Sequence, residues 1–215
     1  MYVGRIVAVG QNSAGRNAAA YRVSSRSFPN RQAVDLNGTI AIMPRPGAED
    51  DLRKNPYIAY NALRLVEVRM VQKWAVVANG SHTDPITEKI AAGLPPRDAL
   101  ALSLLALDYE KDSYNTPRIA AVVPHRGDAA WLGIVRHDAL VVKEVALRPG
   151  HAWYIATYEA NDVRDTQTSP FEARTAGDAA RFLVDGGAFR DLEKPVTSAA
   201  ALANETGFAL GTHMV

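Results

Sequence analysis

Arginine and serine side chains are concentrated in one short segment, Tyr21-Arg22-Val23-Ser24-Ser25-Arg26-Ser27-Phe28-Pro29-Asn30-Arg31. Guanidinium groups and hydroxyls at the end of a strand could hold a phosphate monoester through charge-assisted hydrogen bonds. Side chains alternate between the two faces of a strand, so Arg22 and Ser24 would point one way while Tyr21 and Val23 point the other. The segment by itself is equally compatible with a solvated loop, since charged loops usually face water.

Two tyrosines lie in a second segment, Asn55-Pro56-Tyr57-Ile58-Ala59-Tyr60-Asn61. A phenol keeps its proton at neutral pH and can therefore act as a general acid. In a strand, Asn61 shares a face with Tyr57, and Tyr60 lies on the other face. Most tyrosines in strands are core or interface residues, so the segment by itself favours a structural role.

A polar stretch, Asn79-Gly80-Ser81-His82-Thr83-Asp84, lies between an expected strand and the start of an expected helix. Free backbone N–H groups at a helix N-terminus can bind an anion or a carbonyl oxygen, and Ser81 could assist them. The alternative is an Asn-Gly turn followed by Asp84 as the helix N-cap.

Carboxylates are clustered in Asp108-Tyr109-Glu110-Lys111-Asp112, where an apolar helix is expected to end. Negative charge at a helix C-terminus is mildly unfavourable because it faces the negative end of the helix dipole. The cluster could therefore supply a general base, with Arg118 as a partner for one carboxylate. A solvated helix end is the alternative interpretation.

These segments need elements to position them, and the pattern of apolar and polar residues predicts mostly strands. A hairpin is expected from 3–9 and 18–23, with Arg5 interposed in the first apolar run, and an Asn-Gly turn precedes a further strand. Further strands are expected at 39–43, 57–70, 74–78, 119–123, 131–135, 140–147, 153–158 and 208–215. Helices are expected at 84–92, at 96–109, where apolar residues on nearly every side predict burial, and at 176–184. Residues 196–203 fit either a helix or a strand.

This order of elements predicts an α+β fold, with two antiparallel sheets face to face and helices packed outside them. The 215 residues contain no repeat or linker, so we expect a single domain, 1–215. A formal net charge of +1 argues against binding to nucleic acid. The apolar runs are too short for a membrane span, and the start lacks a signal-peptide layout, so we expect a cytoplasmic protein.

Metal and thiol chemistry find little support in the composition. The chain has no cysteine, which excludes disulfides, thiolate catalysis and cysteine-based zinc sites. Its five histidines show no HxxH or HExxH spacing, so we expect no metal site.

Five motifs in order resemble the archaeal-type IMP cyclohydrolases: YRVSSRSFPNR at 21–31, NPYIAYN at 55–61, NGSHTD at 79–84, DYEKD at 108–112 and TPRIAA at 116–121. The resemblance is strong to about Tyr158 and looser beyond. It implies ring closure of 5-formamidoimidazole-4-carboxamide ribotide (FAICAR) to IMP with loss of water, the last step of purine biosynthesis. It also implies a homo-oligomer without a metal or organic cofactor.

The resemblance further implies a four-layered αββα sandwich similar to the N-terminal nucleophile hydrolases. Tyr2 follows Met1, so no Ser, Thr or Cys stands there as a terminal nucleophile, and we expect neither autoprocessing nor an acyl-enzyme. The connection 67–74 is expected to be longer than in the family. Two alternatives stay open: an amidohydrolase on the same fold, which Tyr2 disfavours, and a non-catalytic protein that binds purine nucleotides.

The resemblance and the chemistry together suggest roles for individual residues. We expect Tyr60 to donate or shuttle a proton, Glu110 to act as base or orient Tyr60, and Arg22 and Asn79 to polarise the formyl or carboxamide oxygens. Arg26, Ser27 and Arg31 are expected to hold the phosphate. The other residues expected to bind the substrate are Ser24, Ser25, Asn61, Gly80, Ser81, His82, Asp108 and Arg118.

Overall fold

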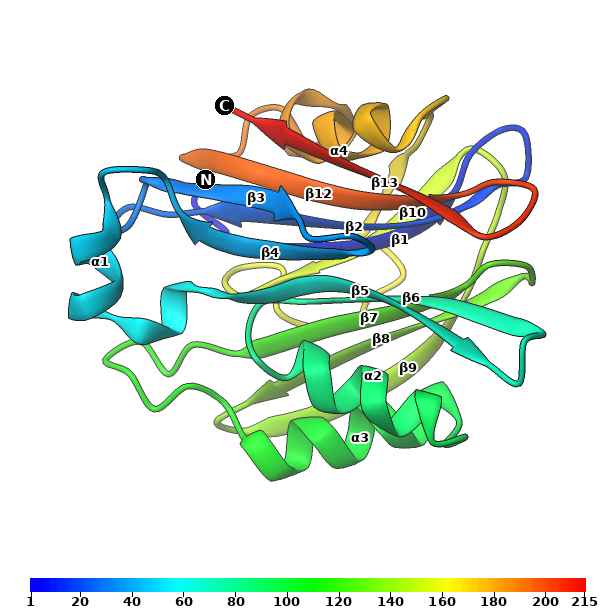
Figure 1. Ribbon diagram of the computed structural model, residues 1–215, viewed down its shortest axis with the longest axis horizontal. Coiled ribbons are helices and arrows are strands. Elements are labelled where there is room, and N and C mark those ends of the chain that lie inside the picture. The colour runs from blue at the N-terminus through cyan, green and yellow to red at the C-terminus, as the bar shows by residue number, and fades with distance from the viewer.

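Strands dominate the computed structural model, which describes all 215 residues and forms two antiparallel sheets (Figure 1). The six-stranded sheet has the order β11-β10-β1-β2-β12-β13 and the seven-stranded sheet runs from β3 to β9 in chain order. The first contains β1 (Ile6–Gln11), β2 (Asn17–Ser24), β10 (His151–Ala156), β11 (Thr168–Pro170), β12 (Pro195–Ala203) and β13 (Phe208–Met214). The second contains β3 (Arg31–Asp35), β4 (Thr39–Pro44), β5 (Tyr60–Val68), β6 (Gln72–Ala78), β7 (Arg118–Pro124), β8 (Ala129–Arg136) and β9 (Ala139–Ala146).

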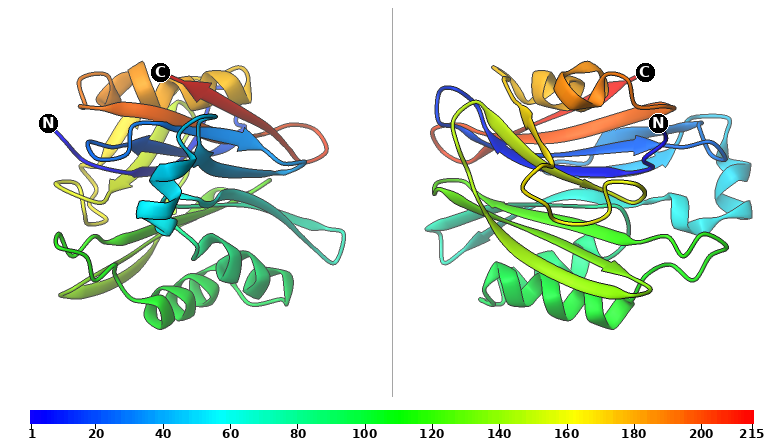
Figure 2. Two further views of the ribbon diagram at one scale, coloured as in Figure 1. Left: turned by 60° about the vertical axis from the view of Figure 1, so that its left-hand side comes forward. Right: turned by 180° about the vertical axis from the view of Figure 1, so that it is seen from behind.

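Helices cover the outer face of each sheet, so the layers run helix, sheet, sheet, helix (Figure 2). Helix α4 (Ala176–Asp185) packs on β12, β13 and β2, while α2 (Thr83–Ala91) and α3 (Pro96–Leu107) pack on the seven-stranded sheet. The short helix α1 (Glu49–Lys54), the turn η1 (Pro56–Ile58) and the turn η2 (Gly187–Phe189) complete the elements. The longest helix, α3, has 12 residues. None of the helices has the length and the apolar character that crossing a membrane requires.

The largest core cluster fills the space between the two sheets and contains 26 buried residues. Alternation along β2 decides which side chains enter it: Tyr21 and Val23 face the other sheet, whereas Ala18 and Ala20 pack toward α4. The same alternation in β1 directs Val7 inward. Two smaller apolar clusters lie between each sheet and the helices that cover it.

The expected hairpin is confirmed, with β1 and β2 paired in register from Ile6 opposite Arg22 to Gln11 opposite Asn17. The ambiguous segment 196–203 is a strand, because β12 lies inside the sheet between β2 and β13 and hydrogen bonds to both. The elements α1, β3, β11, η1 and η2 were not predicted. The expected strand 57–70 begins only at Tyr60, because Tyr57 belongs to the turn η1, so Tyr57 and Asn61 do not share one strand.

Two predictions about helices are wrong. Helix α3 is buried on one face only, through Leu100 and Leu104, while Leu102 and Leu105 are 48% and 66% exposed, since nothing packs on its other side. Asp84 is not the N-cap of α2. The helix begins one residue earlier at Thr83, and no side chain caps it.

Candidate active site

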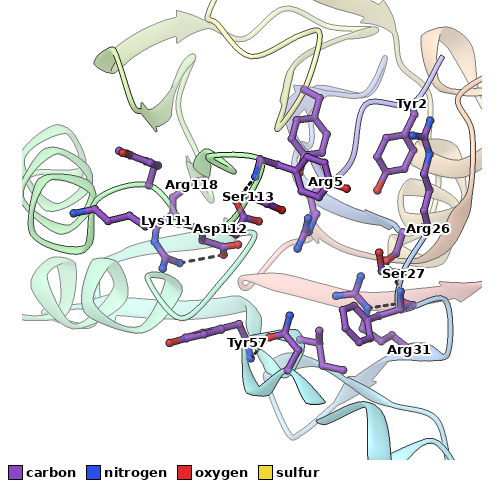
Figure 3. A pocket seen from close by; sticks show the side chains of 18 of the residues that line it. Tyr2, Arg5, Arg26, Ser27, Arg31, Tyr57, Lys111, Asp112, Ser113 and Arg118 are labelled. Carbon is purple, nitrogen blue, oxygen red and sulfur yellow. Dashed lines mark hydrogen bonds and ion pairs between the residues drawn. The ribbon is translucent and has the colours of Figure 1, made fainter. Parts of the chain in front are cut away.

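A cavity of about 1090 Å³ opens at the end of the molecule where the space between the two sheets meets α1 (Figure 3). Five parts of the chain line it: the N-terminus, the segment after β2, the turn η1 with the end of α1, the loop between α3 and β7 with the start of β7, and the segment after β10. Six predicted site residues line this cavity, namely Ser25, Arg26, Ser27, Arg31, Glu110 and Arg118.

Two arginines from the segment after β2 lie on one side of the cavity (Figure 3). Arg31 is buried, its Nε donates to the Phe28 carbonyl, and its Nη1 has no partner. Burial lowers the pKa of this guanidinium, because the charged form loses its hydration. Arg26 is exposed and lies 4.1 Å above the ring of Tyr2. Ser25 stabilises the turn at 25–28, since its Oγ accepts a hydrogen bond from the Phe28 N–H.

A carboxylate and an arginine occupy the opposite side. Glu110 Oε1 lies 3.5 Å from Arg118 Nη1, and the side chains are only 17% and 11% exposed. Burial raises the pKa of Glu110, while the positive charges of Arg5 and Arg118 oppose that rise. The loop that carries Glu110 is held by its backbone N–H, which donates to the Thr116 carbonyl. A buried carboxyl with a raised pKa is a suitable general base.

Tyr60 is nearly fully buried behind the cavity and does not line its wall. Its hydroxyl lies 2.6 Å from that of Tyr21, which reaches it from the other sheet. Burial and the neighbouring Tyr60 raise the pKa of Tyr21 well above its ordinary value, so Tyr21 keeps its proton. Tyr60 also lies close enough to Arg5 and Arg31 to influence the charge of both.

Arg5 is one of the cavity residues that sequence reasoning missed. Gly4 before it has a φ of +72°, and an added Cβ would collide with Thr157, so the chain enters β1 tightly against β10. The Arg5 N–H donates to Thr157 Oγ1 and its carbonyl accepts from the Thr157 N–H. The available signal was a single charge inside an otherwise apolar strand pattern.

Contrary to the prediction, the structure does not bring Arg22 and Ser24 to the cavity. Arg22 is fully buried on the α4 side of β2, where it donates to four carbonyl groups: those of Leu183, Val184, Phe189 and Leu192. Its Nε donates to Ser24 Oγ. Burial lowers its pKa to about 10. Arg22 therefore closes the C-terminus of α4, whose last carbonyls have no partner within the helix.

The segment 79–82 also lies outside the cavity wall and supports Arg118 instead. Both polar groups of the Asn79 side chain form hydrogen bonds with the backbone: Nδ2 donates to the Pro117 carbonyl and Oδ1 accepts from the Ile119 N–H. Gly80 leaves room for Arg118, since a Cβ there would lie 3.0 Å from its Nη1. His82 is buried with Nε2 bonded to the Ile119 carbonyl, and Ser81 is exposed. These contacts differ from the predicted roles in polarising or binding the substrate.

Asn61 and Asp108 also have structural contacts and do not line the cavity. Asn61 Nδ2 donates to Asp84 Oδ1, which also accepts from Arg64, so these side chains join β5 to α2. Asp108 ends α3 with a φ of +57°, and its carboxylate accepts from the Tyr109 N–H.

A cavity lined by arginines and a largely buried carboxylate, with a buried tyrosine pair behind its wall, has the features expected of an enzyme site for a small anionic substrate. The comparison with known families agrees. The family model described as IMP cyclohydrolase-like protein matches residues 2–207, and the chain belongs to this family.

Several archaeal proteins named IMP cyclohydrolase are similar to the chain over nearly its whole length. The protein of Methanocella arvoryzae is 48% identical over 99% of this chain and 98% of its own. The protein of Methanosphaera stadtmanae is 47% identical over 94% of each chain. The protein of Methanococcus maripaludis is 45% identical over 99% of this chain and 100% of its own.

Proposed function

We propose that the chain is an IMP cyclohydrolase that closes FAICAR to IMP, with loss of water, in the cavity described above. The family membership supports the reaction. The observation that carries the location is that Arg31, Glu110 and Arg118 line one cavity. Arg31 is buried, the side chains of Glu110 and Arg118 are largely buried, and each arginine has a buried nitrogen without a partner. Buried charges without full hydrogen bonding are costly, so they are retained where a ligand uses them.

The phosphate of the substrate would lie among Arg26, Ser27 and Arg31. The unpartnered Nη1 of Arg31 supports this placement, because it is a buried donor with no protein acceptor. Ser27 is exposed in the same wall, and Ser25 Oγ can add a donor although it already accepts one hydrogen bond. A phosphomonoester offers several acceptor oxygens and matches this mixture of guanidinium and hydroxyl groups.

Glu110 would be the base for ring closure. The carboxamide nitrogen attacks the formyl carbon, the electron pair of the carbonyl moves to the formyl oxygen, and Glu110 takes the proton that the nitrogen loses. Tyr60 would supply the proton that converts the oxygen to a hydroxyl. Protonated Glu110 would then give its proton to the leaving hydroxyl, so that water departs. The Tyr60 phenolate would take the proton that the formamide nitrogen loses as the carbon–nitrogen double bond forms, which returns both groups to their starting states. Because both reacting groups belong to one molecule, a bound conformer that holds them in contact supplies much of the acceleration.

The layer order also supports a finer proposal, that the fold is the αββα sandwich of the N-terminal nucleophile hydrolases without their nucleophile. The amino group of Met1 lies 3.0 Å from a Glu193 carboxylate oxygen, in an ion pair. We further propose a cytoplasmic homo-oligomer, which the exposed leucines of α3 favour as an apolar contact face. Analytical ultracentrifugation of the purified chain tests the oligomer.

The decisive experiment mixes the purified chain with FAICAR in chelator-treated buffer and follows IMP formation by absorbance. Turnover without added cofactor is expected. Tight binding of IMP without turnover would replace the proposal with a nucleotide-binding protein. Release of formate, with no ring closure, would replace it with an amidohydrolase.

A further inference from the structure

The guanidinium of Arg5 is the least satisfied cation of the cavity. It lines the cavity wall, yet it donates no hydrogen bond to any protein group, and its Nε is buried without a partner. Arg31, by contrast, donates to a carbonyl, and Arg118 lies beside Glu110. A guanidinium has five N–H donors, and leaving them unused away from water is unfavourable.

Strand alternation explains why Arg5 reaches this position. Residues 5, 7 and 9 lie on the same face of the chain, and Val7 and Val9 belong to the core between the sheets. Arg5 precedes β1 by one residue, so its side chain extends from that core into the open end where the cavity lies. Figure 3 shows the guanidinium directed into the centre of the cavity, between the Arg31 side and the Arg118 side.

The neighbours of Arg5 are the groups proposed to move protons. Tyr60, Tyr21 and Glu110 all lie near Arg5, and Glu110 is the member that brings a negative charge at neutral pH. Burial lowers the pKa of Arg5, but these neighbours raise it by more, so the net shift is upward and the side chain stays charged. The serine hydroxyls that suit a phosphate lie instead beside Arg26 and Arg31.

We propose that Arg5 is a catalytic residue that donates hydrogen bonds to the formyl oxygen and stabilises the negative charge formed there during ring closure. The assignment rests on the proposed function. As the nitrogen–carbon bond forms, the carbonyl electron pair moves to the formyl oxygen, and the fixed guanidinium meets this charge. Tyr60 then protonates the oxygen. A cation that the protein already holds in position stabilises the charge as it develops, because it needs no reorganisation at that moment.

Arg5→Ala tests the assignment. We expect kcat to fall by about 10²–10³-fold, the usual effect of losing one oxyanion donor, while KM changes by only a few-fold. Added guanidinium ions should restore part of kcat. Arg5→Lys keeps the charge but not the planar donor fork, so it should remain at least about tenfold slower than the wild type with an unchanged Tm.

Arg136→Ala is the matched control. Arg136 is also half-buried, but its guanidinium is satisfied by Asp138 and the Asn161 carbonyl, outside the cavity. The kcat of Arg136→Ala should equal that of the wild type. The anion that Arg5 binds is either the charge formed on the formyl oxygen or the phosphate of the substrate. Binding of IMP and of inosine to Arg5→Ala separates these two cases: the preference for IMP should survive, because the phosphate is held elsewhere.

Three results would overturn the assignment. If Arg5→Ala keeps the kcat of the wild type, and the wild type converts FAICAR to IMP, the role of Arg5 is refuted while the proposed function stands. A rise in KM with loss of the preference for IMP would make Arg5 a phosphate ligand. A wild-type chain that forms no IMP from FAICAR would refute the proposed function, and this assignment with it.

Discussion

The hydroxyls of Tyr21 and Tyr60 lie 2.6 Å apart and join the two sheets across the core, since Tyr21 belongs to β2 and Tyr60 to β5. Either hydroxyl can donate in this hydrogen bond. Burial and Tyr60 raise the pKa of Tyr21, so Tyr21 keeps its proton. Tyr60 is the member of the pair that is slightly exposed and lies near Arg5 and Arg31. The pair therefore orients the Tyr60 hydroxyl at the inner end of the cavity.

Tyr60→Phe should lower kcat by about 10²-fold or more, because it removes the proposed proton donor and leaves the ring in place. Steady-state kinetics with FAICAR provide the measurement. Tyr154→Phe is the control, since Tyr154 packs on the α4 side of the sheet against Phe189. Equal turnover in Tyr60→Phe and the wild type would remove Tyr60 from the mechanism.

Tyr21→Phe should reduce kcat less than Tyr60→Phe does, because it leaves the acid present but poorly oriented. It should also lower the free energy of unfolding by about 1–3 kcal/mol, since the buried Tyr60 hydroxyl loses its partner. A double-mutant cycle tests the link: Tyr21→Phe should add almost nothing to the kcat loss of Tyr60→Phe. Fully additive losses would show that the two hydroxyls act independently.

Arg31→Ala should raise KM for FAICAR much more than it lowers kcat, because binding of the phosphate is equally strong in the ground state and the transition state. A loss of one charge-assisted contact corresponds to about 1.5–3 kcal/mol, or roughly 10–150-fold in affinity. Isothermal titration with IMP and with inosine checks the site. Inosine binding should be almost unaffected, and an equal loss for both ligands would place the phosphate elsewhere.

The pH dependence of kcat/KM should report Glu110. A base must lose its proton before it acts, so activity rises as pH rises through the pKa of Glu110, which burial holds above its ordinary value of 4.5. Arg118→Met removes a positive charge that lowers this pKa, so the acid limb should move to higher pH. Lys111→Met, whose ammonium pairs with Asp108, should leave the limb in place. If the acid limb of kcat/KM stays at the same pH in Arg118→Met, Glu110 is excluded as the titrating base.

His82 should make the fold sensitive to acid. Burial lowers its pKa from 6.5 to about 3, and its Nε2 faces the Ile119 carbonyl. Below pH 6.5 the unfolded chain takes up a proton that the folded chain refuses, so stability falls by up to about 1.4 kcal/mol per pH unit as pH drops toward 3. His82→Gln removes this group. Thermal unfolding between pH 7 and 4 should therefore show a shallower decline than in the wild type, and parallel curves would contradict the prediction.

Much of the site was accessible from the sequence because its motifs are local. The segment 21–31 contains Arg26, Ser27 and Arg31, and all three line the cavity together with Glu110 and Arg118. Most of the strands and the helices α2, α3 and α4 were also predictable, since alternation and turn residues act over a few positions. The residues 79–82 were recognised as a unit, but their contacts with Arg118 and the 117–119 backbone join parts of the chain 37–40 positions apart.

The sequence by itself determined which residues alternate along each strand and which family the chain resembles. It left open which face of a strand meets the other sheet and which meets a helix, because alternation has a period of two and contains no information about the neighbouring layer. Tertiary packing made that choice: it turned Arg22 toward the C-terminus of α4 and Arg5 and Tyr21 toward the space between the sheets. The cavity follows from that choice, because only side chains on the inner faces can converge where the two sheets open.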